Sequence, residues 1–331
     1  MSSLPELAPA PAEDTRAAVE TPLKQLPSRT PLAATLCFLA VALLTCSYSL
    51  LLQAAKVDGA FAFAPVSVTA AAETLKLAIA LASLRLDAEP PLKLGDCARA
   101  AVPALLYCAQ NTLVYAAMAH LTPPSYQLLS NAKLAATAGL SRLILKKLFS
   151  KTQWAGLAML LASVTLPGVA AALNAPPVGH TGLTPRDLAV GSALMGLVAL
   201  LSGLAGVLTE RLLKHAPGST MFKNAQLYAF GVLLYLQPVY RLSLRPSGLL
   251  AGWTAWTLAL VLNLALQGLA VSWLLRLASN IEKLFAGAAA YFASVILSGP
   301  LFGLAAGWVD AGGGFLLVVA LVVYHRAELR G

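Results

Sequence analysis

A lysine lies about halfway along one apolar stretch of the chain. Lys133 falls inside residues 124–145, a segment with the length and composition of a membrane-crossing helix. A charge at bilayer depth costs about 2.5–3.5 kcal/mol on insertion scales, so it is rarely found there without a partner or a function. At helical spacing it shares one face with Tyr126, Ser130 and Thr137. Lipid cannot satisfy such a polar stripe, so it must face a hydrogen-bonded helix seam or a cavity, and the lysine favours an anion-binding cavity.

Other polar side chains in the apolar stretches could complete that cavity. Glu73 and Lys76 stand at i, i+3 spacing, where they can form an ion pair or where either can face the cavity. Glu210 closes an apolar stretch, as a gate or as a solvated helix end. The further candidates are Tyr107, Gln110, Asn111, Gln127, Asn131, Asn224, Tyr228 and Lys283. Two ammonium groups suit phosphate, while amides, hydroxyls and tyrosine rings suit a base and a sugar.

The composition defines the broad class of protein. Of the 331 residues 58% are hydrophobic and 11% are charged, against about 25% charged residues in soluble domains. The sequence therefore predicts a polytopic membrane protein. Its four cysteines form no CxxC pair, so neither a metal site nor a disulfide framework is expected. Without a Walker A motif, ATP-driven pumping is excluded. We expect no enzyme activity and no cofactor.

The apolar runs predict an all-α membrane protein with ten transmembrane helices. The predicted spans are 32–54, 62–85, 98–119, 124–145, 152–173, 188–210, 222–240, 253–275, 283–303 and 307–325. We expect residues 1–31 to form a disordered cytosolic tail and residues 326–331 to form a second cytosolic tail. The transporter domain is then 32–325. An even number of spans places both termini on the same side of the bilayer.

The basic residues indicate which side that is. Most of them fall in the N-terminal tail and in the connections on the same side, which the positive-inside rule assigns to the cytosol. This distribution explains the net charge of +9 without any nucleic-acid partner. Lys223, at the edge of the seventh span, is expected to extend its ammonium group to the interface.

The fourth and ninth spans share a pattern. Each has a polar cluster with a lysine followed by small residues, at Asn131–Lys133 and at Asn280–Lys283. The pattern indicates two inverted five-helix repeats, about 32–173 and 188–325, with the substrate site between them. Chance similarity between two alanine-rich helices is the alternative. Runs of small residues such as 199–206 indicate close helix packing, either static or at a moving interface.

Several ordered motifs carry a family resemblance over roughly residues 35–325. They are Val102–Tyr107 with Gln110 and Asn111, Tyr126-Gln127 with Lys133, Phe149–Trp154, Ser202–Val207 with Glu210, Asn224–Tyr228 and Asn280–Lys283. In these segments the chain resembles the nucleotide-sugar transporter family of the drug/metabolite transporter superfamily. It is most similar to the branch that holds the CMP-sialic acid, UDP-galactose and UDP-N-acetylglucosamine transporters.

The resemblance implies a function and a site. It implies a Golgi or endoplasmic reticulum antiporter that exchanges nucleotide sugar for nucleoside monophosphate by alternating access. Lys133 and Lys283 would contact the phosphates, while Asn111, Asn224 and Tyr228 would help to hold the nucleoside. The stretch from Leu129 to Lys133 departs from the best-known members, which leaves base and sugar open. Another small-anion or sugar-phosphate exchanger, and a non-transporting membrane scaffold, are the competing interpretations. A homo-oligomer is possible.

Overall fold

The computed structural model describes residues 31–57, 60–84, 89–91, 94–174, 184–245, 247–303 and 306–328. The expected N-terminal tail therefore lies outside the described residues, apart from Pro31, which begins the first helix. At the other end the last helix continues to Glu328, beyond the predicted end of the tenth span at residue 325.

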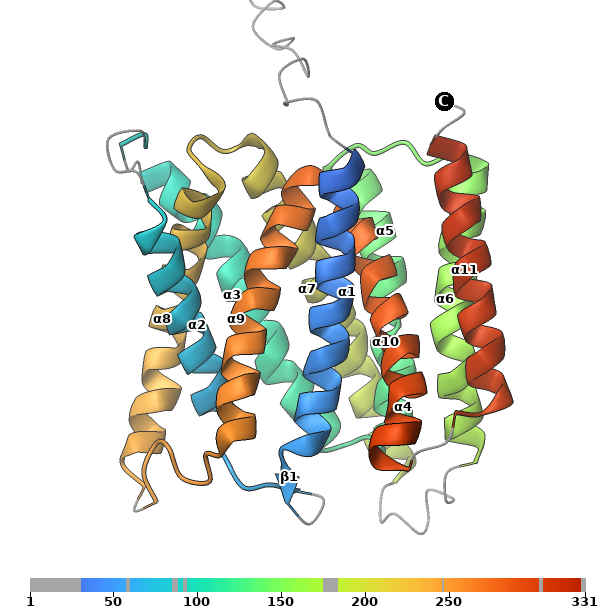
Figure 1. The fold of residues 1–331 in the computed structure, drawn as a ribbon, viewed down its shortest axis with the longest axis horizontal. Coiled ribbons are helices and arrows are strands. Elements are labelled where there is room, and N and C mark those ends of the chain that lie inside the picture. The colour runs from blue at the N-terminus through green and yellow to red at the C-terminus, as the bar shows by residue number, and fades with distance from the viewer. Residues whose placement is uncertain are drawn as a thin grey trace, which may run out of the picture.

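The prediction of an all-helical fold is confirmed, with one small addition. The helices are α1 (Pro31–Ala54), α2 (Pro65–Ala82), α3 (Leu94–Met118), α4 (Pro123–Ser130), α5 (Ala132–Ile144), α6 (Lys151–Leu173), α7 (Pro185–His215), α8 (Thr220–Ser243), α9 (Ala255–Leu277), α10 (Asn280–Phe302) and α11 (Trp308–Glu328). Two-residue strands β1 (Lys56–Val57) and β2 (Ala60–Phe61) pair antiparallel between α1 and α2. Figure 1 shows the helices as one upright bundle.

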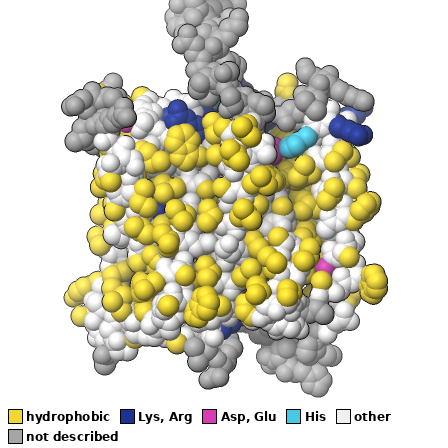
Figure 2. All heavy atoms as spheres, viewed as in Figure 1, with side chains coloured by type: hydrophobic (Ala, Val, Ile, Leu, Met, Phe, Trp, Pro, Cys, Tyr) yellow, Lys and Arg dark blue, Asp and Glu magenta, His cyan; other side chains and the backbone are white. Residues whose placement is uncertain are grey.

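The chain is a multi-pass membrane protein. In its described part, seven helices are long and apolar enough to cross a membrane, namely α1, α2, α6, α7, α9, α10 and α11. Hydrophobic side chains cover most of the face in Figure 2, and lysine and arginine gather mainly toward one edge. Lipid solvates an apolar belt of this kind, so the exposed leucines on the outer helix faces are expected.

The structure corrects the prediction for the fourth span. Residues 124–145 do not form one helix, because α4 ends at Ser130 and α5 begins at Ala132. Other helix bounds differ as well: α7 is longer than the predicted 188–210, and α10 begins at Asn280 instead of 283. The second difference places Lys283 within the first turns of a helix.

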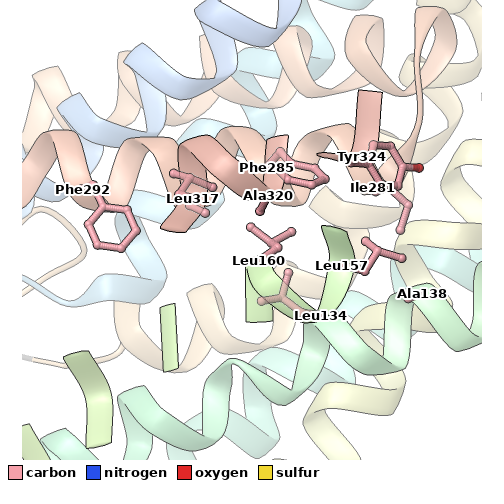
Figure 3. Close-up of a cluster of buried hydrophobic side chains, with 11 residues drawn as sticks. Leu134, Ala138, Leu157, Leu160, Ile281, Phe285, Phe292, Leu317, Ala320 and Tyr324 are labelled. Carbon is pink, nitrogen blue, oxygen red and sulfur yellow. The ribbon is translucent and has the colours of Figure 1, made fainter. Parts of the chain in front are cut away.

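Helices from the two halves of the chain pack against each other throughout the bundle. α1 packs on α9 and α10, α7 packs on α3 and α5, α2 packs on α8, and α6 packs on α11. The largest apolar cluster joins α5, α6, α10 and α11 around Leu160 and Phe285 (Figure 3). α1 begins and α11 ends at the same end of the bundle, which we call the terminal end (Figure 1).

Candidate functional site

The break between α4 and α5 positions Lys133. Around Asn131 the backbone hydrogen bonds tighten, because its N–H donates to Leu128 and its carbonyl accepts from Leu134, each three residues away. The Asn131 side chain donates to the Val164 carbonyl of α6 at 2.9 Å, which fixes the break against a neighbouring helix. Lys133 is therefore the second residue of α5, directly after a one-residue interruption of the helix.

A first cavity of about 320 Å³ opens at this helix start. Lys133 and Lys283 both line it, from α5 and α10 respectively. Ser130, Asn131 and Thr137 line it as well, so most of the predicted stripe does face a cavity. The other polar lining residues are Thr45, Ser202, Gln267 and Tyr291. Among the described residues, neither lysine ammonium has an ion-pair or hydrogen-bond partner.

A second cavity, of about 360 Å³, holds the predicted pair from α2. The Lys76 ammonium lies 2.5 Å from the Glu73 carboxylate and 4.7 Å from the centroid of the Tyr228 ring. Both sequence interpretations therefore hold at once, because the two residues pair with each other and also line the cavity. Glycines provide the room: a Cβ on Gly268 would lie 2.6 Å from Lys76 Cδ, and one on Gly231 would lie 2.9 Å from Glu73 Oε2.

Phenols and amides line the rest of the second cavity. The Tyr228 hydroxyl is 3.2 Å from the Ser272 hydroxyl, and Asn111 Nδ2 donates to the Tyr235 hydroxyl at 3.4 Å. Tyr107 completes this aromatic set. Three phenol rings beside an amide and an ion pair give this cavity apolar surface and hydrogen-bonding groups, which together suit a planar base.

The two cavities are neighbours and share part of their walls. Gln267, Val271 and Lys283 line both of them. Gln267 Nε2 donates to the Thr45 hydroxyl of α1 at 2.7 Å, a contact that spans 222 positions of sequence. The junction thus presents an ammonium group from α10 and an oriented amide from α9.

Some predicted site residues do not reach either cavity. Tyr126 packs against an apolar cluster that contains Leu121 and Met195, and it does not line the first cavity. Gln110 lines neither cavity, and its Oε1 is buried with no partner in the described part of the chain. Asn224 is 0% exposed, and both of its amide atoms also lack a described partner. The side chain of Gln127 lies outside the described residues.

The prediction for Lys223 is wrong. Its side chain does not extend to the interface, because it is only 5% exposed. The ammonium group instead donates to the Leu213 carbonyl in the last turn of α7 at 3.0 Å. A cation near a helix C-terminus satisfies orphan carbonyls and favours the negative end of the dipole, so Lys223 ties α8 to α7.

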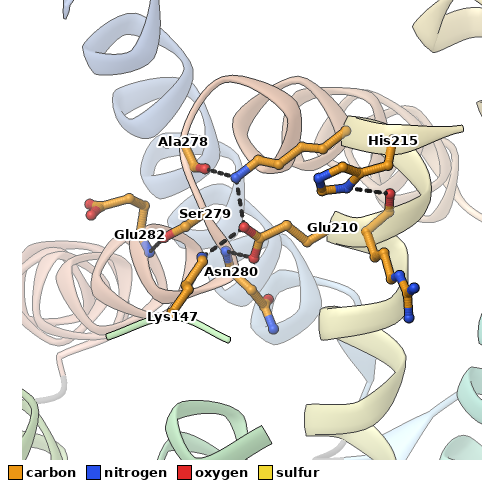
Figure 4. Close-up of polar contacts among 9 residues, drawn as sticks. Lys147, Glu210, His215, Ala278, Ser279, Asn280 and Glu282 are labelled. Atoms are coloured by element: carbon orange, nitrogen blue, oxygen red, sulfur yellow. Dashed lines mark hydrogen bonds and ion pairs between the residues drawn. The ribbon is translucent and has the colours of Figure 1, made fainter. Parts of the chain in front are cut away.

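Glu210 lies at the centre of an ionic cluster near the terminal end (Figure 4). Its carboxylate is fully buried and accepts from Lys147 at 2.7 Å and from Lys214 at 2.6 Å. It also accepts from the backbone N–H of Asn280 at 2.9 Å, while Lys214 donates to the Ala278 carbonyl. A solvated helix end is thereby excluded, because the cluster joins α7, the α5–α6 connection and the start of α10.

The sequence interpretation missed several lining residues. Tyr235 is one of them, although it follows Tyr228 by seven positions and shares its helix face. Thr45 and Ser202 are hydroxyls in apolar helices and gave only a weak signal. Gln267 was visible as an intramembrane amide, but nothing in the sequence paired it with Thr45.

The fold and the polar interior are those of a polytopic helical membrane protein with internal cavities, and comparison with known proteins identifies the family. A family model for the nucleotide-sugar transporter matches residues 33–325, so the chain belongs to the nucleotide-sugar transporter family. A CMP-sialic acid transporter 2 of Oryza sativa subsp. japonica is 32% identical over 75% of this chain and 71% of the relative. A UDP-galactose translocator of Mus musculus is 35% identical over 57% of this chain and 48% of its own length.

One further relative agrees with this assignment, and one solved structure shares the fold. A probable UDP-sugar transporter protein of Rattus norvegicus is 34% identical over 69% of this chain and 74% of the relative. A crystal structure superposes with a TM-score of 0.68, covering 90% of this chain and 99% of that chain. At 18% identity this likeness shows the shared fold.

Proposed function

We propose that this chain is an antiporter of the Golgi or endoplasmic reticulum membrane that exchanges a cytosolic pyrimidine nucleotide sugar for a lumenal nucleoside monophosphate. One observation carries the proposal. Lys133 and Lys283 line a single cavity, and in the described part of the chain neither has a protein partner. Two uncompensated ammonium groups in the interior of a membrane protein need an anionic ligand.

Phosphate is the anion that this setting suits. Lys133 is the second residue of α5, and its ammonium group is a compact positive charge that suits a phosphate oxygen. Lys283 follows the start of α10 and reaches the same space. Broken helices whose half-helix ends meet a bound anion are a recurrent device of secondary transporters.

The second cavity suits the nucleoside. Tyr107, Asn111 and Tyr228 line it, which supports the role proposed for the last two. Asn224 precedes Tyr228 by one helical turn, and its unpartnered amide would gain hydrogen bonds if a ligand or a helix movement reached it. CMP-sialic acid and UDP-galactose, which appear in the names of two relatives, are both pyrimidine nucleotide sugars.

Alternating access in the proposed scheme uses ten spans as two inverted repeats, α1–α6 and α7–α11, with α4 and α5 counted as one span. The packing pattern supports this pairing. If α1 corresponds to α7 and α3 to α9, the α1–α9 contact becomes the α7–α3 contact. In the same way the α1–α10 contact becomes the α7–α5 contact. Both termini are cytosolic in this scheme, and the Glu210 cluster is then a cytosolic gate.

Exchange by purified protein tests the proposal. Proteoliposomes preloaded with CMP or UMP should take up the matching labelled nucleotide far faster than empty ones, and Lys133→Ala should abolish that uptake. Lys151→Ala, at the exposed start of α6, is the matched control and should leave uptake unchanged. Wild-type protein that shows no trans-stimulation by either nucleotide would refute the proposal. Exchange of sugar phosphates alone would favour the simpler anion exchanger, and no exchange of any anion would favour a scaffold.

A further inference from the structure

Gln267 lines both cavities, so a ligand that occupies both would lie against its side chain. Only three described residues line both spaces, and of these Val271 is apolar and Lys283 is cationic. Gln267 is therefore the one neutral polar group at the junction, among the residues that the structure describes. Whatever part of a ligand lies between the two cavities meets an ammonium group and an amide.

Thr45 fixes the orientation of that amide. The bond from Gln267 Nε2 to the Thr45 hydroxyl, at 2.7 Å, uses one N–H and directs the amide group. In the described part of the chain the Gln267 carbonyl oxygen has no hydrogen-bond partner, and the side chain is only partly buried at the cavity wall. An amide carbonyl is an acceptor with two lone pairs, so it selects a ligand group that donates.

The chemistry of a nucleotide sugar indicates which donor this is. Such a molecule has a nucleoside, a phosphate linkage and a sugar in line. The anionic phosphate linkage suits the ammonium group of Lys283, which lines both cavities. On the sugar side, the donor closest to the phosphate is carried by C2, next to the phosphate-bearing C1. It is a hydroxyl in hexoses and an amide N–H in N-acetylhexosamines. A sialic acid has no donor at that carbon and carries a carboxylate beside the linkage.

We infer that Gln267, oriented by Thr45, is a specificity-determining residue that accepts a hydrogen bond from the donor at C2 of the sugar. This inference rests on the proposed function and narrows it. The transported class is then nucleotide hexoses and N-acetylhexosamines, in preference to nucleotide-linked sialic acid. A group that accepts a hydrogen bond from a substrate donor discriminates against an analogue that lacks the donor, because that hydrogen bond is then lost.

Competition for exchange tests the inference. Uptake of labelled UMP into UMP-loaded proteoliposomes is inhibited with UDP-galactose, with UDP-2-deoxygalactose and with CMP-sialic acid. We expect the wild type to need about 5–10 times more of the deoxy sugar for half-inhibition, the factor that one hydrogen bond supplies. In Gln267→Leu that ratio should fall to near one, and Thr45→Val should lower it partly. The double variant should match Gln267→Leu alone, because Thr45 acts only through Gln267.

Controls keep this inference separate from the proposed function. Gln53→Leu makes the same substitution at an exposed position in the last turn of α1 and should retain the wild-type ratio. If the wild type exchanges neither UMP nor CMP, the proposed function fails. If it exchanges them but the ratio is the same in Gln267→Leu, or if CMP-sialic acid competes better than UDP-galactose, only the inference about Gln267 is overturned.

Discussion

The Glu210 carboxylate of α7 accepts a hydrogen bond from the backbone N–H of Asn280, the first residue of α10, at 2.9 Å. Lys283 follows in the next turn of the same helix and lines both cavities. If a bound anion moves Lys283, the movement therefore reaches the first turn of α10, whose Asn280 N–H is bonded to Glu210. This geometry connects occupancy of the cavity with the ionic cluster near the terminal end, through one helix start.

Glu210→Gln should lower the stability of the helix contacts that the Glu210 cluster makes. The substitution keeps the shape of the side chain but removes the charge from hydrogen bonds with Lys147 and Lys214, and such bonds contribute about 1.5–3 kcal/mol each. We expect a lower melting temperature in detergent and faster alkylation of a cysteine placed at Ser202 in the first cavity. Asp96→Asn is the control, because its partner Arg99 is largely exposed and such pairs contribute little. Unchanged alkylation would exclude a gate.

Lys133→Met should stabilise the empty protein while it removes ligand binding. The wild-type ammonium has no described protein partner in the cavity, and an apolar side chain avoids the cost of that charge. The melting temperature without ligand should rise, or at least not fall. Saturating UMP or CMP should raise it in the wild type, by linkage, but not in the variant. A variant that melts lower and still responds to nucleotide would show that Lys133 is structural.

The Glu73–Lys76 pair should behave as a coupled unit. Its side chains are only 19% and 12% exposed, so removing one partner leaves a poorly solvated charge. Glu73→Gln and Lys76→Met should each destabilise the protein, and the double variant should be more stable than the sum of the two effects. A double-mutant cycle of melting temperatures measures this coupling. Simple additivity would show that water, and not the partner, solvates each charge.

Two glycines of α7 should respond in opposite ways to the same substitution. A Cβ at Gly203 would lie 3.0 Å from the backbone nitrogen of Thr137, so Gly203→Ala forces α5 and α7 apart. We expect a cost of about 1–3 kcal/mol, typical of overpacking. Gly196 has open space around it, so Gly196→Ala should be neutral or gain up to about 1 kcal/mol in helix propensity. Equal melting temperatures for the two variants would contradict the close approach of α5 and α7.

The sequence was sufficient to predict features that depend on composition and local spacing. Helix content, the pairing of Glu73 with Lys76, and the cavity faced by Lys133 and Thr137 all follow from hydropathy and the helical period. The break at Asn131 does not, because the polar stripe continues through it with correct spacing. The side chain of Asn131, at the break, donates a hydrogen bond to Val164 in another helix, and no local sequence pattern predicts that contact.

Contacts between distant segments account for the other errors. The position of Lys223 at a span edge predicts an interfacial residue, but the carbonyl of Leu213 gives it a buried partner. Tyr126 shares the helical period of Lys133 but lies on the other side of the break. Gln267 gains its importance from Thr45 in α1, which no local pattern can indicate.

The ammonium groups of Lys133 and Lys283 in the first cavity also affect the free energy of the transporter without a ligand. To close around an empty cavity would seal two mutually repelling positive charges away from water, a state that costs several kcal/mol per ion. A nucleoside monophosphate, with about two negative charges at neutral pH, cancels them. In the proposed antiport, the empty transporter is therefore slow to change its orientation. We expect one-for-one exchange to follow from this charge compensation.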